Sequence, residues 1–455
     1  IISRLKGRMM CKESYEAIDE GSLSLGLIRL AIPIALSGML QQLFNSVDVA
    51  VIGRFAGGLA LAAVGANAAN VSLFVMLLTG LSVGPNVLIA RLIGAKEKEE
   101  ISESVHTAIL FSIVCGLGIM VGGQLLSEAL MDWMHTPGEI ADGAILYFRI
   151  YLLGLPFIAL YNFCASILRC IGDSKRPLYT LFASGILNVL LNLVFVVAFH
   201  MDVAGVATAT VLSNVFSAFV LLGILMREQG AIRLDVTKLR LKMQYVGEIV
   251  KIGLPSGIQG MLFSLSNLFI QSTLNGYGAS AIAGSSTALT FEYITYNIAL
   301  AFSQACVTFL SRSYGAGDYR QCRRIYRRSL LYGFLFTSVV SLLFAWKASM
   351  FAGLFTADAG IIGYAVIRMR YVGLLEGLSA FHESGSAGMR AIGVSLPPAV
   401  LTVIGSVCFR ILWVLYVLPL NPTYLMLMLV YPASWIVTGA VMQLACHRYM
   451  GKLGR

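Results

Sequence analysis

Long apolar stretches alternate along the chain with short segments that carry charge, Gly or Pro. Twelve of these stretches reach about 20 residues, the length that an α-helix needs to cross a bilayer. They lie at residues 29–53, 61–89, 104–126, 145–168, 178–199, 204–226, 248–274, 281–311, 327–350, 364–388, 395–418 and 424–447. The pattern predicts an all-α polytopic membrane protein with twelve transmembrane helices.

The placement of basic residues predicts the orientation of these helices, because Lys and Arg near span ends are retained in the cytoplasm. An even number of spans puts both termini on one side. Together with alternate loops, that side holds 27 of the 33 Lys and Arg residues. The opposite face holds Arg54, Arg149, Lys347, Arg368 and Arg370, and Arg410 falls inside a span. We therefore expect a protein of the plasma or inner membrane with both termini cytoplasmic.

The two halves of the sequence repeat each other with an offset of 221 or 222 residues. The recurring landmarks are Pro33 and Pro255, Gly38 and Gly260, Ala95 and Ala316, Arg149 and Arg370, Arg169 and Arg390, and Pro177 and Pro398. Each half has six spans, so the two copies share one orientation in the membrane. We expect two six-helix lobes that face each other across a cleft and are related by a pseudo-two-fold axis along the membrane normal.

The repeat also predicts the domain limits. Residues 1–24 form a cytoplasmic segment, 25–227 the first lobe, 228–247 a polar cytoplasmic linker, 248–447 the second lobe and 448–455 a cytoplasmic tail. Paired lobes of this kind are typical of transporters that work by alternating access. Nothing in the pattern indicates an oligomer, so we expect a monomer.

The composition excludes several classes of protein. Hydrophobic residues make up 58% of the chain and charged residues 12%, a balance that neither a soluble domain nor a disordered protein has. In a soluble protein, the net charge of +10 would indicate a nucleic-acid partner. Here the densest basic run, at residues 320–328, lies next to a predicted span, so we assign it to membrane lipids and expect no nucleic-acid binding.

The sequence contains no motif of enzyme chemistry. The eight cysteines never form a Cys-x-x-Cys pair, so we expect neither a disulfide framework nor a metal cluster. A Gly-x-x-x-x-Gly-Lys-Ser/Thr phosphate loop is missing as well. We therefore expect a protein that is not an enzyme, has no cofactor and draws its energy from an ion gradient.

A carboxylate inside a predicted span is energetically costly and therefore marks a candidate functional site. Asp48 lies in the first span on the same helix face as Gln41 and Asn45, which we expect to contact substrate. The fifth and sixth spans add Asn188, Asn192 and Thr210. Such oxygens suit a hard cation such as Na⁺, and a desolvated carboxylate can instead hold a proton. Alternatively, these groups only join helices through buried hydrogen bonds.

Further polar side chains lie in the predicted spans of the second half. We expect substrate contacts from Gln259, Asn267, Gln271, Glu292, Tyr296, Glu376 and Glu383. Carboxylates beside aromatic rings in an apolar cleft attract a large organic cation through charge and through the ring faces. The alternative is that the acids pair within the protein, for instance Glu383 with Arg390 or with Arg410.

The ordered set of motifs resembles the multidrug and toxic compound extrusion (MATE) family. The matching segments are Pro33 through Gly53, Leu-Ala-Ala-Val-Gly65, Ile-Ala-Arg-Leu-Ile-Gly-Ala95, Ile-Leu-Arg-Cys-Ile-Gly-Asp-Ser-Lys-Arg-Pro177, Leu-Asn188-Val-Leu-Leu-Asn192 and their second-half counterparts. The likeness extends from Ser24 to Met450. It implies a twelve-helix exporter that exchanges protons or sodium ions for amphipathic, often cationic compounds.

The resemblance also implies roles for single residues. In the branch that looks closest, a first-helix Asp is accompanied by Asn and Asp on the fifth helix and Thr on the sixth, a pattern that Asp48, Asn188 and Thr210 match. Asn192 stands in place of the second Asp, which removes a negative charge and favours a proton over sodium. Phe263 stands near the position where members that bind sodium in the second lobe have a Glu, so that site lacks a ligand here.

Two functions remain open from the sequence. The first is a secondary antiporter that exports organic compounds, with Asp48, Asn188, Asn192 and Thr210 coupling transport to a proton or to a bound Na⁺. The second is a flippase or exporter of a lipid-linked saccharide precursor, because such proteins share a related architecture. A flippase for an anionic pyrophosphate lipid should line its cleft with Arg and Lys. The charges inside the predicted spans are mostly acidic, which favours the exporter.

Overall fold

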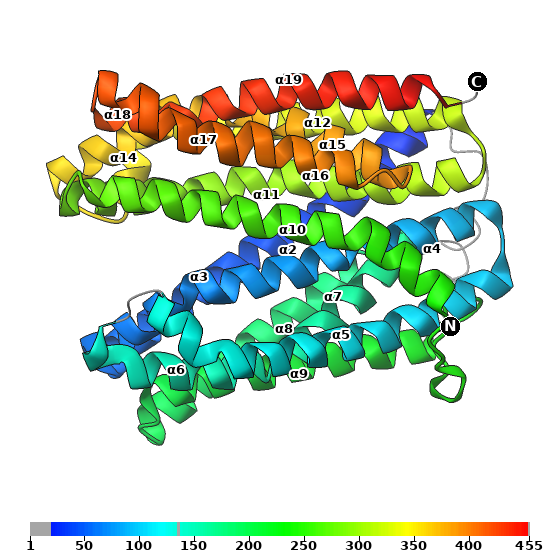
Figure 1. The fold of residues 1–455 in the computed structure, drawn as a ribbon, viewed down its shortest axis with the longest axis horizontal. Helices are drawn as coiled ribbons and strands as arrows, with labels where there is room; N and C mark the ends of the chain where they lie inside the picture. Colours follow the sequence, from blue (N-terminus) through cyan, green and yellow to red (C-terminus); the bar gives the residue numbers. More distant parts are fainter. Residues whose placement is uncertain (1–19, 134–136, 454–455) are drawn as a thin grey trace.

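The computed structural model describes residues 20–133 and 137–453, and the regular elements in these two ranges are all helical (Figure 1). The first half forms α2 (Glu20–Phe55), α3 (Gly57–Leu81), α4 (Val83–Ala95), α5 (Lys98–Trp133), α6 (Gly138–Leu152), α7 (Leu155–Cys170), α8 (Lys175–Asn192) and α9 (Asp202–Arg227). The second half forms α10 (Met243–Asn275), α11 (Ala279–Gly315), α12 (Tyr319–Trp346), α13 (Ala348–Gly353), α14 (Ala359–Tyr371), α15 (Ser379–Ala391), α16 (Leu396–Thr402), α17 (Phe409–Leu412), α18 (Tyr424–Met428) and α19 (Val430–Gly451).

Each of the twelve predicted spans is helical. Within the described residues, nine helical segments are long and apolar enough to cross a membrane, and the pair α6 and α7, bent by 42°, adds a tenth. The seventh predicted span is the continuous helix α10, and the tenth is α14 and α15 joined by the 3-10 helix η3 (Gly373–Leu378). The protein therefore has twelve membrane helices in two six-helix lobes.

The fourth and tenth spans are broken near their middle, where the sequence analysis expected continuous helices. In the fourth span, Pro156 lies in the first turn of α7, and proline disrupts the turn that precedes it. In the tenth span, Gly373 and Gly377 lie in η3, and glycine weakens a helix. The two breaks are about one repeat offset apart, so the internal repeat extends to local structure.

Buried apolar side chains form one main core in each half of the chain, and two smaller clusters lie in the second half. The first helix takes part in both cores: Leu27, Leu30 and Ile34 belong to the second-half core, whereas Val51 and Ile52 belong to the first-half core. Helix α2 therefore runs from one half to the other (Figure 1). The predicted domain limits, which assign most of α2 to the first lobe, stay a prediction.

The halves come closest where α3 and α4 meet α10 and α11. A Cβ atom added to Gly94 would lie 1.9 Å from the carbonyl oxygen of Arg312, and one added to Gly315 would lie 2.0 Å from that of Arg91. The repeat offset relates these two contacts to each other, so they are symmetric. Gly80 of α3 approaches the backbone of α10 in the same way. Glycine is required at these crossings because any side chain would push the two backbones apart.

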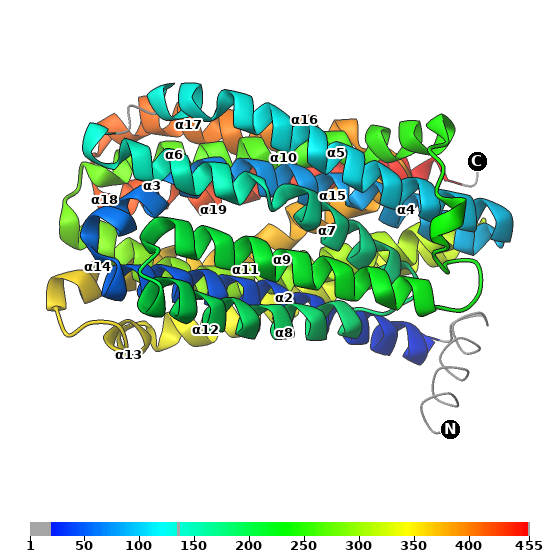
Figure 2. The same cartoon turned by 90° about the horizontal axis from the view of Figure 1, so that it is seen from below.

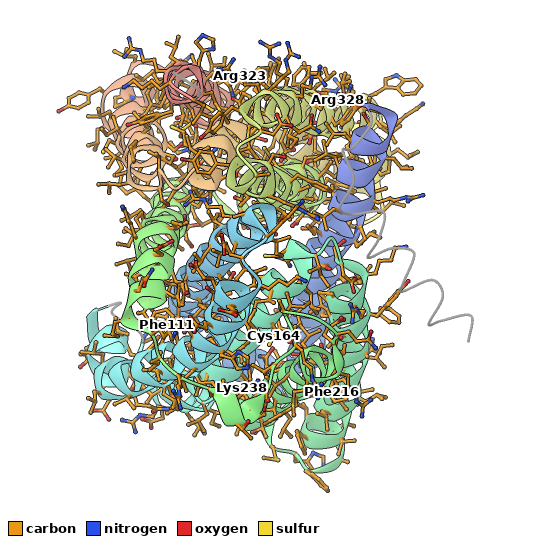
Figure 3. The ribbon with its side chains drawn as sticks, turned by 90° about the vertical axis from the view of Figure 1, so that its right-hand side faces the viewer. Phe111, Cys164, Phe216, Lys238, Arg323 and Arg328 are labelled. Carbon is orange, nitrogen blue, oxygen red and sulfur yellow. The ribbon has the colours of Figure 1, made fainter. Side chains whose placement is uncertain are left out.

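Both ends of the described chain lie at the end of the molecule that also carries the linker (Figure 2). The linker contains the 3-10 helix η2 (Val236–Lys238), which begins where the Asp235 carboxylate accepts a hydrogen bond from the backbone N–H of Thr237. Figure 3 looks onto this end, where Lys238, Arg323 and Arg328 are found. This is the end that the basic residues predict to be cytoplasmic.

Candidate functional site

Asp48 lies in the second half of α2 and takes part in a chain of polar side chains from three helices. Its Oδ1 accepts a hydrogen bond from Nδ2 of Asn192, 2.5 Å away. The same Nδ2 donates to Oδ1 of Asn188 one turn earlier in α8, at 3.2 Å, and Nδ2 of Asn188 donates to Oγ1 of Thr210 in α9, at 3.4 Å. The structure therefore brings together the four residues that the sequence analysis selected for ion coupling.

The end of α8 gives this chain two further properties. Asn192 is fully buried, and its Oδ1 has no hydrogen-bond partner among the described residues. Directly after Asn192, α8 continues as the π-helical segment η1 (Leu193–Ala198). Such π-helical turns are rare and are frequently found at functional sites. The site thus combines a carboxylate, an unpaired amide oxygen and a locally widened helix.

Two tyrosines that the sequence analysis did not select complete the surroundings of Asp48. Tyr147 and Tyr151 of α6 are buried, their ring centroids are 6.0 Å apart, and both interact electrostatically with Asp48. Asn67 of α3 holds this helix by donating from Nδ2 to the carbonyl of Ala144, at 2.9 Å. The one feature of the sequence that could have indicated these residues is the four-residue spacing of the two tyrosines, which puts both on one face of an apolar span.

Gln41 and Asn45 share a face of α2 with Asp48 and are exposed. Three residues before Gln41, a Cβ atom added to Gly38 would lie 1.9 Å from Oδ1 of Asn297 in α11. Because Gly38 and Gln41 lie on one side of the helix, this face of α2 is directed toward the second half. Their contact with substrate stays a prediction.

Glu292, one of the predicted substrate contacts, forms a bidentate ion pair inside the second half. Arg368 donates from Nε to Oε1 at 2.6 Å and from Nη2 to Oε2 at 2.8 Å, and its Nη1 donates to Oγ of Ser285 at 2.6 Å. Its guanidinium also lies 4.9 Å from the ring centre of Tyr431. The side chain of Arg368 is 2% exposed, so its charged group lies inside the protein. The charge of Glu292 is therefore balanced within the protein. The side of the membrane to which Arg368 belongs stays a prediction.

The other two second-half acids are also buried and hydrogen-bonded. Glu376 accepts a hydrogen bond from the hydroxyl of Thr295. Glu383 accepts one from the hydroxyl of Tyr296, at 2.8 Å, and lies 4.0 Å from Nη2 of Arg390. The pairing of Glu383 with Arg390 that the sequence left open is therefore present, whereas Glu376 has no basic partner within 4.0 Å among the described residues.

Arg410 is fully buried in the second half and forms no ion pair with a described residue. Its Nη1 donates to Oδ1 of Asn267 at 2.9 Å and its Nε to Oγ of Ser434 at 3.1 Å. The guanidinium lies over the rings of Phe263 and Tyr431, at 4.8 and 4.9 Å from their centres. Nη2 has no partner in the described part of the chain. Asn267, predicted to contact substrate, is thus bound to Arg410.

The two remaining predicted contacts lie on α10 away from these acids. Gln259 is buried, and its Oε1 has no partner among the described residues. Gln271 donates from Nε2 to Oδ1 of Asn275, at 3.2 Å. The second-half residues therefore form separate groups rather than one continuous site, and their substrate role stays a prediction.

The fold and these groups define the class of the protein as a multi-pass membrane protein of two repeated lobes, each with ionisable side chains in its interior. The sequence model of the MatE family matches residues 33–194 and 255–415, one range in each half. The chain belongs to this family of membrane transporters, as the motifs indicated.

Two relatives support the same assignment, and a solved structure shows the same fold. The chain is 28% identical to the probable multidrug resistance protein YoeA of Bacillus subtilis over 390 residues, which cover 84% of this chain and 83% of that one. It is 26% identical to the probable multidrug resistance protein NorM of Thermotoga maritima over 384 residues, or 83% and 82% of the two chains. A MOP superfamily transporter from Pyrococcus furiosus has the same fold, with a TM-score of 0.87, 23% identity and coverage of 97% and 100%.

Proposed function

We propose that this chain is a secondary antiporter that exports amphipathic, cationic organic compounds in exchange for protons or sodium ions. Membership of the MATE family supports transport, and relatives named as multidrug resistance proteins support a broad choice of compounds. The observation that carries the coupling role is the Asp48 carboxylate, hydrogen-bonded to Asn192 inside the first half. Acidic groups at membrane depth are typical of ion pathways.

The geometry favours a proton over a sodium ion at Asp48. Asn192 turns its Nδ2, a donor, toward the carboxylate, whereas a sodium ion there would need amide oxygens. Protonation would remove the charge that strengthens this hydrogen bond and so loosen α8 from α2. In this proposal, that change couples the proton to movement of the first half.

The second half would bind the transported compound. Of Glu292, Glu376 and Glu383, only Glu376 has no basic partner within 4.0 Å among the described residues. It is therefore the strongest candidate to attract a cationic compound. The resemblance to the family implies a sodium site near Phe263 in other members, and in this chain the guanidinium of Arg410 covers the ring of Phe263. This supports a single coupling site, in the first half.

Transport measured in proteoliposomes tests this function, with ethidium as the cationic probe and with proton and sodium gradients imposed separately. Asp48→Asn should lower gradient-driven efflux at least about tenfold, because the amide can neither take up a proton nor carry its charge. Asp142→Asn, which changes an exposed acid of α6, is the matched control and should transport normally. Undiminished efflux by Asp48→Asn would remove Asp48 from the mechanism. Efflux driven by sodium alone would overturn only the choice of ion.

A lipid-linked saccharide flippase is the second candidate, and one observation favours it. Arg410 and Arg368 are buried in the second half, and Nη2 of Arg410 is unpaired among the described residues. Guanidinium groups suit pyrophosphate, and the interior is less acidic than the sequence indicated. A fluorescent, short-chain polyprenyl pyrophosphate saccharide in the same proteoliposomes distinguishes the two. Its transport, without transport of ethidium, would replace the exporter.

We further propose that the protein is a monomer of the plasma or inner membrane with both termini in the cytoplasm. The linker and the basic residues Lys238, Arg323 and Arg328 lie at one end of the molecule, which supports this orientation (Figure 3). A reporter that is active only in the cytoplasm, fused after the last residue, tests it.

A further inference from the structure

A groove of about 580 Å³ lies between the start of α16 and the end of α19, and neither Asp48 nor a second-half acid lines it. One wall is formed by Leu396, Val400 and Leu401, and the other by Arg448, Tyr449 and Lys452. Its volume falls within the range of small-molecule sites, roughly 300–1,000 Å³. The end of α19 lies close to the end of the described chain, at the same end of the molecule as the linker (Figure 1).

The wall contributed by α16 is apolar and faces outward. Leu396 and Val400 are 63% and 45% exposed, and their four-residue spacing puts them on one side of the helix. The same side chains belong to a predicted transmembrane span, so this surface meets the hydrocarbon of the bilayer. It therefore suits an acyl chain.

The wall contributed by α19 is cationic. Arg448 and Lys452 are exposed, lie one turn apart and form no salt bridge within the described residues. The ring of Tyr449 lies beside them, with Nζ of Lys452 6.0 Å from its centre. Arg and Lys next to Tyr at a span end are typical of the boundary between headgroups and hydrocarbon.

The two helices that form the walls of the groove carry no acidic residue of their own. Glu383 is the last acid in the sequence, so neither α16 nor α19 contains one. A further cation is brought to the same edge by Arg323 of α12, whose Nη2 donates to the carbonyl of Leu453 at 2.8 Å. The α19 side of the groove is therefore positive, whereas its α16 side is apolar.

We propose that this groove binds one anionic glycerophospholipid of the adjacent leaflet, with its phosphate at Arg448 and Lys452 and an acyl chain along Leu396 and Val400. A soluble anion would use the charged edge and leave the apolar wall uncovered. A zwitterionic lipid would cover the wall but gain little from the cations. The anionic lipid is the occupant that satisfies both walls at once.

Native mass spectrometry of the purified full chain, titrated with phosphatidylglycerol or phosphatidylcholine, tests the site. Arg448→Gln combined with Lys452→Gln should weaken retention of one phosphatidylglycerol about 30-fold, since each basic group near a lipid surface contributes about 1 kcal/mol. The control is Arg233→Gln combined with Arg240→Gln, which removes two exposed cations from the linker at the same end. This control should retain the lipid.

A second variant and a second readout separate the lipid site from other outcomes. Val400→Trp, which fills the groove and keeps the cations, should also reduce retention. Phosphatidylglycerol should raise the Tm of the wild type in detergent more than phosphatidylcholine does, and this difference should vanish in Arg448→Gln/Lys452→Gln. Equal losses in the linker control would show nonspecific charge attraction. Displacement by inorganic phosphate would show a soluble-anion site. Either result overturns the proposal.

Discussion

The buried charges of this protein differ in what neutralises them. Glu292 faces the guanidinium of Arg368 through two hydrogen bonds, so its charge is fixed by a strong partner. Arg410 lies against two ring faces and donates to one amide oxygen and one hydroxyl, and a guanidinium stays protonated in proteins. Asp48, by contrast, has a neutral amide as its partner. A carboxylate held in this way can change its charge without leaving an opposite charge unpaired. Glu376 shares this property through the hydroxyl of Thr295, so it is the chain of Asn192, Asn188 and Thr210 beside Asp48 that leads us to place ion coupling there.

The ion pair between Glu292 and Arg368 leads to a prediction about stability. Glu292→Gln or Arg368→Gln alone should lower the free energy of unfolding by about 3–5 kcal/mol, because each leaves a buried charge without its partner. The double variant removes both charges and should be closer to the wild type than either single variant. Denaturant unfolding in detergent micelles measures these differences.

The exposed ion pair between Arg149 and Glu128 provides the control for this cycle. Its side chains are 45% and 67% exposed, so Glu128→Gln should change stability by less than about 1 kcal/mol. If the losses from Glu292→Gln and Arg368→Gln simply added in the double variant, the two side chains would not interact and the ion pair would have no energetic role.

At the scale of helices, glycines decide how closely the two halves pack. Gly94 of α4 meets the backbone of α11, and Gly315 of α11 meets the backbone of α4. These glycines recur at the repeat offset, so the pseudo-two-fold relation between the halves generates both contacts. Substitution of either glycine should therefore have the same effect on the arrangement of the halves.

Gly94→Val and Gly315→Val should each hold α4 and α11 farther apart. The added Cβ would lie 1.9 or 2.0 Å from a carbonyl oxygen, and ordinary contact needs about 3.5 Å, so the backbones must separate by about 1.5 Å or more. Distances between spin labels at Glu100 of α5 and Arg320 of α12 would report the change. Gly118→Val, at a position with no atom within 4 Å of the new Cβ, is the control and should leave the distance unchanged. An unchanged distance in Gly94→Val and Gly315→Val would show that these two glycines do not set the separation of α4 and α11.

The helices themselves could be predicted from the sequence, because an apolar stretch of this length has no other way to satisfy its backbone in lipid. The grouping of Asp48 with Asn188 and Asn192 followed from helix spacing and from the family motifs. Their contact through Nδ2 of Asn192 did not follow from the sequence.

Contacts that depend on how a helix is rotated about its axis were missed. Arg368 reaches Glu292 across 76 residues, and Tyr147 lies near Asp48, only because particular faces of α14, α11, α6 and α2 meet. Spans that are apolar on all sides carry little periodicity from which to predict such faces. The breaks in the fourth and tenth spans were missed for a related reason, since apolar residues continue through both.

At the scale of the whole molecule, polar contacts between the halves hold the arrangement seen here. Thr308 donates from Oγ1 to Oδ1 of Asn86 at 3.1 Å, and Arg169 donates from Nη1 to Oε1 of Gln304 at 2.9 Å. The bond between neutral side chains contributes about 0.5–1.5 kcal/mol net, and the one from the charged guanidinium about 1.5–3 kcal/mol. A small number of them can therefore be broken by the free energy of ion binding. Alternating access requires such contacts to be reversible, because one lobe has to move against the other.

Ser72 of α3 and Ser264 of α10 offer a direct test of that movement, because their hydroxyl oxygens lie 2.9 Å apart across the two halves. Ser72→Cys with Ser264→Cys, made in a Cys408→Ser background to remove the exposed cysteine of the described chain, should form a disulfide under mild oxidation. Efflux from proteoliposomes should then fall at least about tenfold and recover with reductant, because the halves can no longer separate at α3 and α10. Ser72→Cys alone should transport normally under both conditions. If the cross-linked protein, verified by its thiol count, exported ethidium at the wild-type rate, transport would not require the halves to part at this point, and the movement would have to occur within a lobe.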